Sequence, residues 1–219
     1  QHYQEILIFV FLFKSRFKYY LRASALLVLF GFICLDVGLL QVVAQKNVSE
    51  QDRRNARVQA TYIARLVTFI RWEQNETEEI KDFKIVVLGD ENLGLVQSLN
   101  FLVEQSNLTT DGPPVSVIHY PNSESKAALE FITEGAEFVY FTRDCKLTTK
   151  EVIPLRNGAL LLSEGREFVE NENGCIAFEQ RRNRIKLIVN GKCFNRKFAK
   201  VNPILTSLRS VVEVVNPSL

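Results

Sequence analysis

The sequence predicts an α/β fold: a mostly parallel sheet flanked by helices on both faces, ending in an antiparallel hairpin and a C-terminal helix. Two observations support this class. Segments with helical period alternate with short β-branched runs along most of the chain, and the last two such runs are separated by only four residues. With 47% hydrophobic and 24% charged residues, the chain is too apolar for disorder and too charged for a multi-span membrane protein.

The N-terminus carries an apolar segment, residues 23–44, which contains no Lys or Arg and a single acid, Asp36. As a helix it is long enough to cross about 30 Å of hydrocarbon. Four basic residues precede it and only Lys46 follows closely, so the positive-inside rule predicts export of everything after Gln45. The end of the segment, Val42-Val43-Ala44, fits a signal peptidase site. We expect residues 1–44 to be a leader, either a cleaved signal peptide or a retained anchor, and 45–219 to form one domain.

Charge limits the partners of that domain. The leader holds four basic and two acidic residues, which leaves the remainder balanced at 23 of each. A neutral domain argues against nucleic acid, because phosphate binding needs a basic excess. The basic residues are nevertheless uneven, and eight of them occur without an acid among them: Arg181, Arg182, Arg184, Lys186, Lys192, Arg196, Lys197 and Lys200. This run is either a solvated face or a docking patch for an anionic surface.

The first predicted element is an amphipathic helix over 52–72. Its apolar residues recur at spacings of four and three, while arginines and threonines occupy the opposite face. Phe83 to Leu88 is a β-branched run closed by Gly89-Asp90, which indicates a strand that ends in a turn.

Helical period returns over 92–106 through three regularly spaced leucines. Val115 to His119 is again strand-like and is stopped by Tyr120-Pro121-Asn122. Residues 123–134 are predicted to be helical, with Ser123 or Ser125 as the N-cap.

A third strand is predicted over 138–142, which consists of aromatic and β-branched residues. Thr148 can cap a short helix that runs to about Ile153, before Pro154. Residues 159–162 then form a buried apolar strand.

Residues 175–179 and 184–189 flank a short polar connection and predict a β-hairpin. After it, Asn202-Pro203 supplies an N-cap and an N1 proline for a last helix. The core face of that helix is expected to hold Leu205, Leu208, Val211 and Val212.

Motifs for catalysis are missing from the sequence. The turn Gly89 to Gly94 has Leu95 and Val96 where a P-loop needs Lys and Ser or Thr, so we interpret it as an ordinary turn with Asp90 capping the next helix. Ser116 and His119 are three residues apart on one strand and point to opposite faces, which argues against a local catalytic pair. The cysteines lack metal-site spacing. We therefore expect no catalytic residue, metal or cofactor.

Three cysteines follow the leader: Cys145, Cys175 and Cys193. Because Cys175 opens the first hairpin strand and Cys193 lies just beyond the second, the hairpin would bring these two together as a disulfide, leaving Cys145 buried or free. The alternative is three unpaired small core residues.

Several segments resemble the YfiR/HmsC family. Val58 to Ile63, continuing to Trp72, is similar to the family's opening helix, and Phe83 to Asp90 is similar to its first strand. Phe138 to Thr142 matches the middle strand. Gly174 to Ile176 with Arg184 to Asn190 matches the closing hairpin. The chain departs from the family pattern at Gln59, Glu73 and Cys175, where a lysine, a proline and a glycine are usual.

The resemblance implies a non-enzymatic periplasmic regulator that binds and restrains an inner-membrane signalling protein. A diguanylate cyclase, whose cyclic-di-GMP output would fall, or a sensor kinase would be such a partner; a homodimer is left open. We expect partner contacts from Arg65, Arg71 and Trp72, at the end of the first helix, because Trp and Arg dominate interface energetics. The alternative for Trp72 is that it covers the end of the sheet.

A second hypothesis is a periplasmic small-ligand-binding module that feeds a sensor or receptor. In open α/β sheets, ligands bind at the carboxyl ends of the strands. The ligand would then lie near Gly89, Asp90, Thr142 and Arg143.

Overall fold

The computed structural model describes residues 49–72, 82–105, 114–182, 184–194 and 199–216. The leader expected over 1–44 lies outside these ranges. None of the helices in the described ranges is long and apolar enough to cross a membrane.

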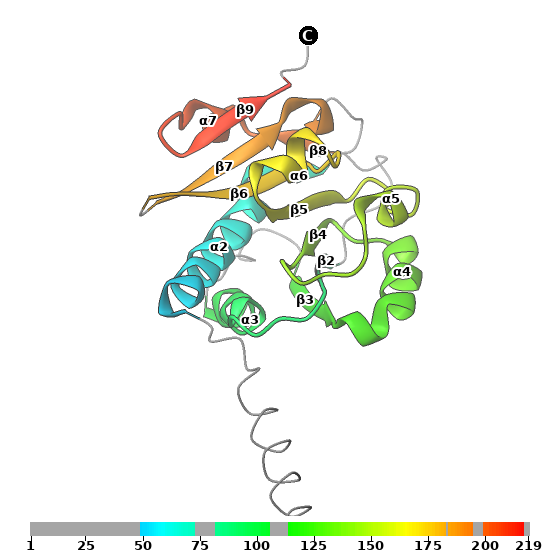
Figure 1. The fold of residues 1–219 in the computed structure, drawn as a ribbon. Helices are drawn as coiled ribbons and strands as arrows, with labels where there is room; N and C mark the ends of the chain where they lie inside the picture. Colours follow the sequence, from blue (N-terminus) through cyan, green and yellow to red (C-terminus); the bar gives the residue numbers. More distant parts are fainter. Residues whose placement is uncertain (1–48, 73–81, 106–113, 183, 195–198, 217–219) are drawn as a thin grey trace, which may run out of the picture. The chain divides into compact units, whose positions relative to one another are not determined.

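A seven-stranded sheet forms the centre of the domain (Figure 1). Its strands in chain order are β2 (Phe83–Leu88), β3 (Val115–Tyr120), β4 (Phe138–Phe141), β5 (Leu160–Glu164), β6 (Ile176–Arg181), β7 (Arg184–Asn190) and β9 (Val212–Val215). Their spatial order is β3-β2-β4-β5-β6-β7-β9. The first five are parallel, β7 runs antiparallel to β6, and β9 runs parallel to β7. The predicted mostly parallel sheet with a closing hairpin is confirmed.

Helices cover both faces of the sheet, as the sequence predicts. The helices are α2 (Glu50–Phe69), α3 (Leu95–Gln105), α4 (Ser125–Glu134), α5 (Thr149–Val152) and α6 (Arg166–Glu170). From β2 the chain moves to β3 on one side and then crosses to β4 on the other, so right-handed crossovers put α3 and α4 on opposite faces. Helix α2 packs against α3. The connections through α5 and α6 cross the sheet in the same direction as the one through α4, so these helices lie on the face of α4.

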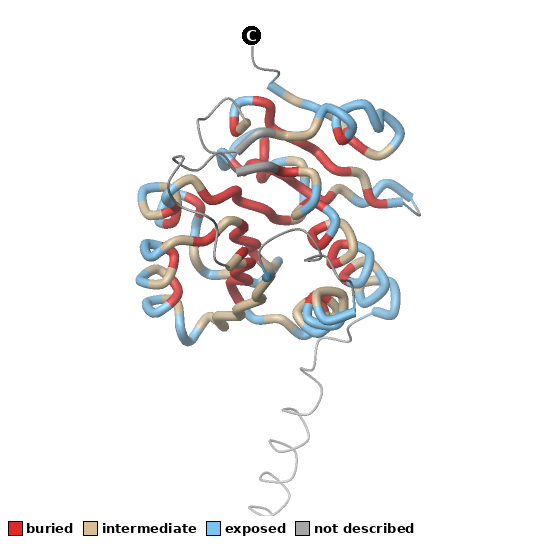
Figure 2. Tube along the Cα trace, turned by 180° about the vertical axis from the view of Figure 1, so that it is seen from behind, coloured by how far each residue is buried: buried red, intermediate tan, exposed pale blue. Residues whose placement is uncertain are grey.

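Burial is greatest where both faces are covered. The side chains of Ile85, Val86 and Leu161 are completely buried, and the buried part of the trace follows the central strands (Figure 2). A strand enclosed on both faces needs apolar residues at every position, which explains why β2, β4 and β5 appear in the sequence as continuous rather than alternating apolar runs.

Local signals set several element ends. Ser49 accepts a hydrogen bond from the Asp52 amide and caps α2. Thr148 caps α5 as predicted, with the Glu151 carboxylate accepting from its amide at 2.7 Å. The predicted serine cap of α4 is wrong, because Ser125 is the first helical residue and its hydroxyl donates to the Asn122 carbonyl.

The first helix ends earlier than its periodicity predicts. It stops at Phe69, and Ile70–Trp72 form strand β1, which pairs antiparallel with β8 (Ala199–Val201) in a separate two-stranded sheet. The Ile70 backbone is extended, at φ −114° and ψ 118°. A partner strand about 130 positions away along the chain supplies the hydrogen bonds, and no local pattern reveals it.

The predicted last helix is also wrong in its extent. Asn202 and Pro203 begin α7 as predicted, but the helix covers only Pro203–Ser207, and Leu208 is 43% exposed. Val212 lies instead in β9, which pairs with β7. The run 211–215 is almost entirely β-branched, and its strand propensity prevails over the helical spacing once β7 offers an open edge.

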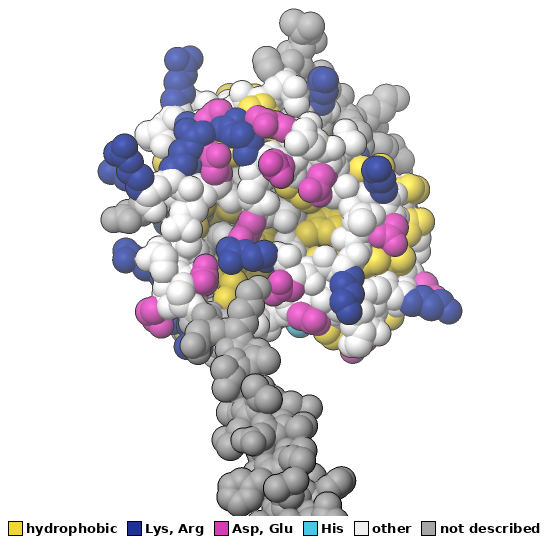
Figure 3. Space-filling model, in the orientation of Figure 1, with side chains coloured by type: hydrophobic (Ala, Val, Ile, Leu, Met, Phe, Trp, Pro, Cys, Tyr) yellow, Lys and Arg dark blue, Asp and Glu magenta, His cyan; other side chains and the backbone are white. Residues whose placement is uncertain are grey.

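Helix α6 has no counterpart among the predicted elements, because its residues belong to an acidic stretch. Arg166 joins it to the sheet through Glu179 on β6 and Glu213 on β9, at 3.3 and 2.7 Å. Lys186 on β7 also reaches Glu213, at 3.0 Å. Basic and acidic side chains lie beside one another on this side of the molecule (Figure 3). We call Arg166, Glu179, Lys186 and Glu213 the α6 ion network.

The predicted disulfide between Cys175 and Cys193 is present, with Cα atoms 5.6 Å apart, and Cys145 is free. It joins the start of β6 to the short helix η2 (Gly191–Phe194) that follows β7. Closing a loop of this length contributes about 3 kcal/mol on the loop-entropy model.

The α6 ion network predicts an acid-sensitive contribution to stability. Hydrogen bonds from Arg166, then Lys186, lower the pKa of Glu213 to about 2. A carboxylate with a depressed folded-state pKa stabilises the fold above its unfolded pKa, and that contribution disappears as the pH falls towards the folded value. Glu213→Gln should lower the urea unfolding midpoint at neutral pH, and its difference from wild type should shrink between about pH 5 and about pH 2.

Glu130→Gln on α4 is the matched control, because the Glu130 side chain is 70% exposed and its ion pair with Lys126 is long, at 3.9 Å. A Glu213→Gln deficit that is constant with pH would contradict the assigned role.

Candidate functional site

The candidate site lies beside β2, where the direction in which successive strands are added across the sheet reverses. Because β2 is paired to both β3 and β4, the loop after β2 leads to α3 on one face and the loop after β4 leads to α5 on the other. The diverging loops leave a crevice at the carboxyl ends of these strands, the usual ligand position in open α/β sheets. We call this feature the switch-point hollow.

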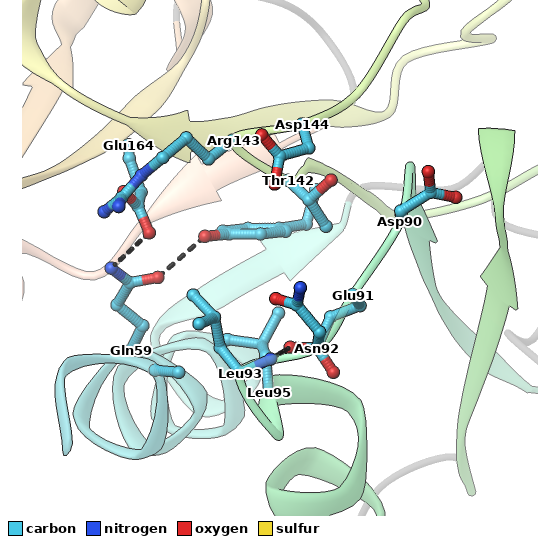
Figure 4. Close-up of a pocket in the computed structure, with 12 residues that line it drawn as sticks. Gln59, Asp90, Glu91, Asn92, Leu93, Leu95, Thr142, Arg143, Asp144 and Glu164 are labelled. Carbon is cyan, nitrogen blue, oxygen red and sulfur yellow. Dashed lines mark hydrogen bonds and ion pairs between the residues drawn. The ribbon is translucent and has the colours of Figure 1, made fainter. Parts of the chain in front are cut away.

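The hollow encloses about 330 Å³ of space, open solvent included. Residues of α2, of the two loops, of the start of α3 and of the ends of β4 and β5 line it (Figure 4): Ala56, Gln59, Asp90, Glu91, Asn92, Leu93, Leu95, Tyr140, Thr142, Arg143, Asp144 and Glu164.

A buried glutamine connects three elements in the wall. Gln59 of α2 is only 5% exposed. Its amide nitrogen donates to Glu164 Oε1 at 3.0 Å, and its amide oxygen accepts from the Tyr140 hydroxyl at 2.7 Å (Figure 4). Burial, with a further contribution from the Glu164 charge, holds the pKa of Tyr140 well above its usual value, so the phenol remains a donor.

Arg143 closes the same network on its outer side. Its Nη2 atom lies 2.7 Å from Glu164 Oε2, and its Nη1 atom lies 3.6 Å from Asp52 Oδ1 of α2. The hydrogen bond to Glu164 is the main reason that the pKa of Arg143 is raised. Arg143 therefore already has two carboxylate partners and joins α2 to the ends of β4 and β5.

Of the four residues predicted to bind a ligand, three line the hollow: Asp90, Thr142 and Arg143. Gly89 serves the backbone instead. Its φ is +97°, and a Cβ there would collide with Thr142 Oγ1 and with Cys145.

Asp90 does not cap α3 as expected. Its carboxylate accepts from the Asn122 amide at 3.0 Å and from Asn122 Nδ2 at 2.9 Å, and these bonds lower its pKa. The neighbouring Glu91 takes the expected role, because its carboxylate accepts from the Val96 amide in the first turn of α3 at 3.4 Å. Asp90 thus ties the loop after β2 to the loop after β3.

Charge restricts what the hollow can bind. Four carboxylates line it and a single arginine, already paired, accompanies them. Phosphate and other anions are repelled by such a wall, while cationic or hydrogen-bond-donating groups are favoured.

The residues tested as a catalytic pair have separate partners. Ser116 Oγ donates to Asp82 at 2.9 Å, and His119 Nε2 lies 2.8 Å from the Gly89 carbonyl oxygen. The described residues include no group of three His, Cys, Asp or Glu that could hold a metal ion.

The predicted partner contacts are only partly visible. Arg65 is exposed on α2. Arg71 and Trp72 lie in β1, whose backbone pairs with Lys200 and Ala199 of β8, and their side chains fall outside what the structure describes. Their role as a contact surface remains a prediction.

Comparison with known proteins identifies the family. The YfiR/HmsC-like family model matches residues 56–209, from α2 to the turn after α7. The chain belongs to the YfiR/HmsC-like family. A search of curated proteins gave no match.

The YfiR/HmsC-like match contains strands β1 to β8 and every residue that lines the switch-point hollow, while β9 and Asp52 lie outside it. The family is regulatory and periplasmic, and the Cys175–Cys193 disulfide fits an oxidising compartment. The resemblance seen in the separate sequence motifs is confirmed.

The residues that sequence analysis missed are Gln59, Tyr140 and Glu164. The only local signal was a polar residue, Gln59, among the small apolar residues of the buried face of α2. Its partners are 81 and 105 positions away, so no spacing rule connects them.

The buried network predicts a specific cost for removing one hydroxyl. Tyr140→Phe should lower the free energy of unfolding by about 1–3 kcal/mol, because it leaves the buried Gln59 oxygen without a donor. Urea denaturation measures the difference. Tyr120→Phe, a partly exposed tyrosine on β3, is the control and should change stability by less than about 0.5 kcal/mol. Equal losses in both variants would contradict the network.

Proposed function

We propose that this protein acts in the periplasm as a regulator that binds and restrains an inner-membrane signalling protein and lowers its output. A diguanylate cyclase that produces cyclic-di-GMP is the partner that membership of the YfiR/HmsC-like family favours most. The family match over 56–209 is the observation that carries this proposal.

The state of the hollow supports binding rather than chemistry. Three of its polar side chains, Gln59, Tyr140 and Glu164, are joined by hydrogen bonds through Gln59, as expected of groups that hold a wall in shape. A general acid or base must instead be within reach of a substrate proton and titrate near the working pH. The Tyr140 hydroxyl meets neither condition, because it is buried and because burial raises its pKa well above the usual value for tyrosine, away from the working pH.

The proposed contact surface begins on the outer side of α2 and continues into β1. Arg65 is exposed there and has no ion-pair partner in the described ranges. Arginine and tryptophan contribute most when they become buried against a partner, so Arg65, Arg71 and Trp72 are the residues to test.

Deletion of the gene should raise cyclic-di-GMP in the cells that carry it, and Arg65→Ala or Trp72→Ala should reproduce part of that rise. Each variant should weaken co-purification of the membrane partner by about tenfold or more, as is typical of interface anchors. Cyclic-di-GMP is measured by mass spectrometry of cell extracts, and partner capture is measured by pull-down from detergent-solubilised membranes.

Lys126→Ala on α4 is the control, because Lys126 is 94% exposed and lies on the opposite face. Thermal melting distinguishes the alternatives for Trp72. A core tryptophan changed to alanine should lose about 3–5 kcal/mol of stability, whereas a contact tryptophan should leave melting nearly unchanged. A Trp72→Ala variant that only unfolds would contradict its assignment as a contact.

The switch-point hollow favours a second candidate function, a periplasmic small-ligand-binding module. Its position at the carboxyl ends of β2, β4 and β5 and its acidic wall would suit a small cationic ligand.

Native mass spectrometry of the purified protein should then show a retained small molecule. Glu91→Gln should weaken its retention while keeping an oxygen that can cap α3 through the Val96 amide, and Glu134→Gln on α4 serves as the control. Protein that carries no small molecule and captures a membrane cyclase would reject this candidate in favour of the regulator.

A further inference from the structure

The basic run from Arg181 to Lys200 does not form one continuous patch. Lys186 belongs to the α6 ion network, and Arg181 Nε lies 2.6 Å from Glu179 Oε2. Arg182 and Arg184, at the turn between β6 and β7, are exposed and have no ion-pair partner within the described part of the chain. Within the described part of this run, Arg182 and Arg184 therefore place two unpaired charges at the tip of the hairpin, apart from the exposed Lys192 on η2.

The first turns of α2 carry the same kind of charge. Arg53, Arg54 and Arg57 are exposed, and the only acids of the helix are Glu50 and Asp52 in its first turn. Asp52 faces Arg143 in the hollow, while Glu50 is 80% exposed and approaches Arg57 only to 4.0 Å. Such an exposed pair neutralises little charge.

The fold brings these two groups to one end of the molecule. Asn55 Nδ2 of α2 donates to Gln180 Oε1 of β6 at 2.6 Å, which sets the arginines of the helix beside the hairpin tip. Lys and Arg side chains project along the edge of the molecule where the β6–β7 turn lies (Figure 3). We call Arg53, Arg54, Arg57, Arg182 and Arg184 the basic end.

The stability of the fold does not explain this concentration of charge. Arg53 and Arg54 stand close to the N-terminus of α2, where the helix dipole favours acids over bases. Five arginines with one exposed acid beside them also repel one another. An anionic surface that binds several guanidinium groups at once would relieve both costs, and guanidinium matches phosphate in geometry.

The position of α2 in the chain indicates which anionic surface. Its cap, Ser49, follows the apolar segment 23–44 after only four residues, and an extended chain spans about 3.5 Å per residue. While that segment is in a bilayer, the basic end is thus within reach of the lipid headgroups. We infer that the basic end docks on the anionic phospholipid headgroups of the inner membrane, on its periplasmic side.

This inference goes beyond the proposed function and does not depend on a cyclase partner. It has a geometric consequence, because β6 is parallel to β2, β4 and β5 and all four end at the same edge of the sheet. Docking through the β6–β7 tip would turn that edge, with the switch-point hollow, towards the bilayer and its proteins.

The test uses the full chain in nanodiscs of phosphatidylcholine, with or without about 30% phosphatidylglycerol. Modification of arginines by phenylglyoxal, measured by mass spectrometry, reports which guanidinium groups are covered. In the anionic discs, Arg57 and Arg182 should react at about one fifth of their rate in the neutral discs, or more slowly still. Raising the salt from about 0.05 M to about 0.5 M should remove the difference.

The variant Arg53→Gln/Arg54→Gln/Arg184→Gln leaves Arg57 and Arg182 as reporters. At about fivefold per arginine it should weaken docking on the order of 100-fold, so both reporters should react equally in the two kinds of disc. The matched control, Lys126→Gln/Lys150→Gln/Lys192→Gln, removes three exposed charges elsewhere and should keep the protection.

Three results would overturn the inference. One is equal reactivity of the wild-type arginines in both kinds of disc. Another is protection that survives the triple arginine variant, which would locate the contact elsewhere. The third is protection that requires a co-purified membrane protein and not the lipid, which would assign the basic end to an acidic protein face.

Discussion

Strand β2 pairs in parallel with β3 on one side and with β4 on the other, and the rest of the architecture depends on this double pairing. It requires the chain to cross from one edge of the growing sheet to the other, so that α3 and α4 cover opposite faces. Both faces of β2 are then enclosed, which is why its apolar side chains are completely buried. The same reversal separates the loops after β2 and β4 and so creates the hollow between them.

Helix α2 stabilises this arrangement from outside the alternating βα units. It precedes the sheet in sequence, yet Gln59 bonds to the ends of β4 and β5, and Asp52 meets Arg143. Buried polar groups are tolerated only when they are paired, and each member of this network satisfies another. The helix therefore adds to the direct bonds between these two strand ends, where Ser163 Oγ donates to the Phe141 carbonyl at 2.9 Å and Arg143 pairs with Glu164. Any partner that moves α2 would change the shape of the hollow, which links the proposed contact surface to the switch point.

Sequence patterns predicted the parts of the fold that local physics determines. The buried runs of β2, β4 and β5, the cap at Thr148 and the hairpin with its disulfide follow from propensity, capping and turn geometry, and all are present. The failures share a cause. The end of α2, the start of β9 and the position of α6 depend on partners far along the chain, namely β8, β7 and the carboxylates bound by Arg166. At the site, the strand ends identified Asp90, Thr142 and Arg143, but Gln59, Tyr140 and Glu164 come together only after folding.

The neutral net charge of the domain conceals a separation that only the fold reveals. Along one edge of the sheet, acids gather where β2, β4 and β5 end, and arginines gather where β6 turns into β7. Part of the acidic charge is neutralised internally, since Arg143 pairs with Glu164 and Asp52, whereas Arg182 and Arg184 have no such partner in the described residues. Unpaired charge at the tip of a hairpin remains hydrated and available, while paired charge in the hollow is held in fixed geometry. The two regions are therefore suited to different tasks: the basic end to a broad anionic surface, and the hollow to a small group of defined shape.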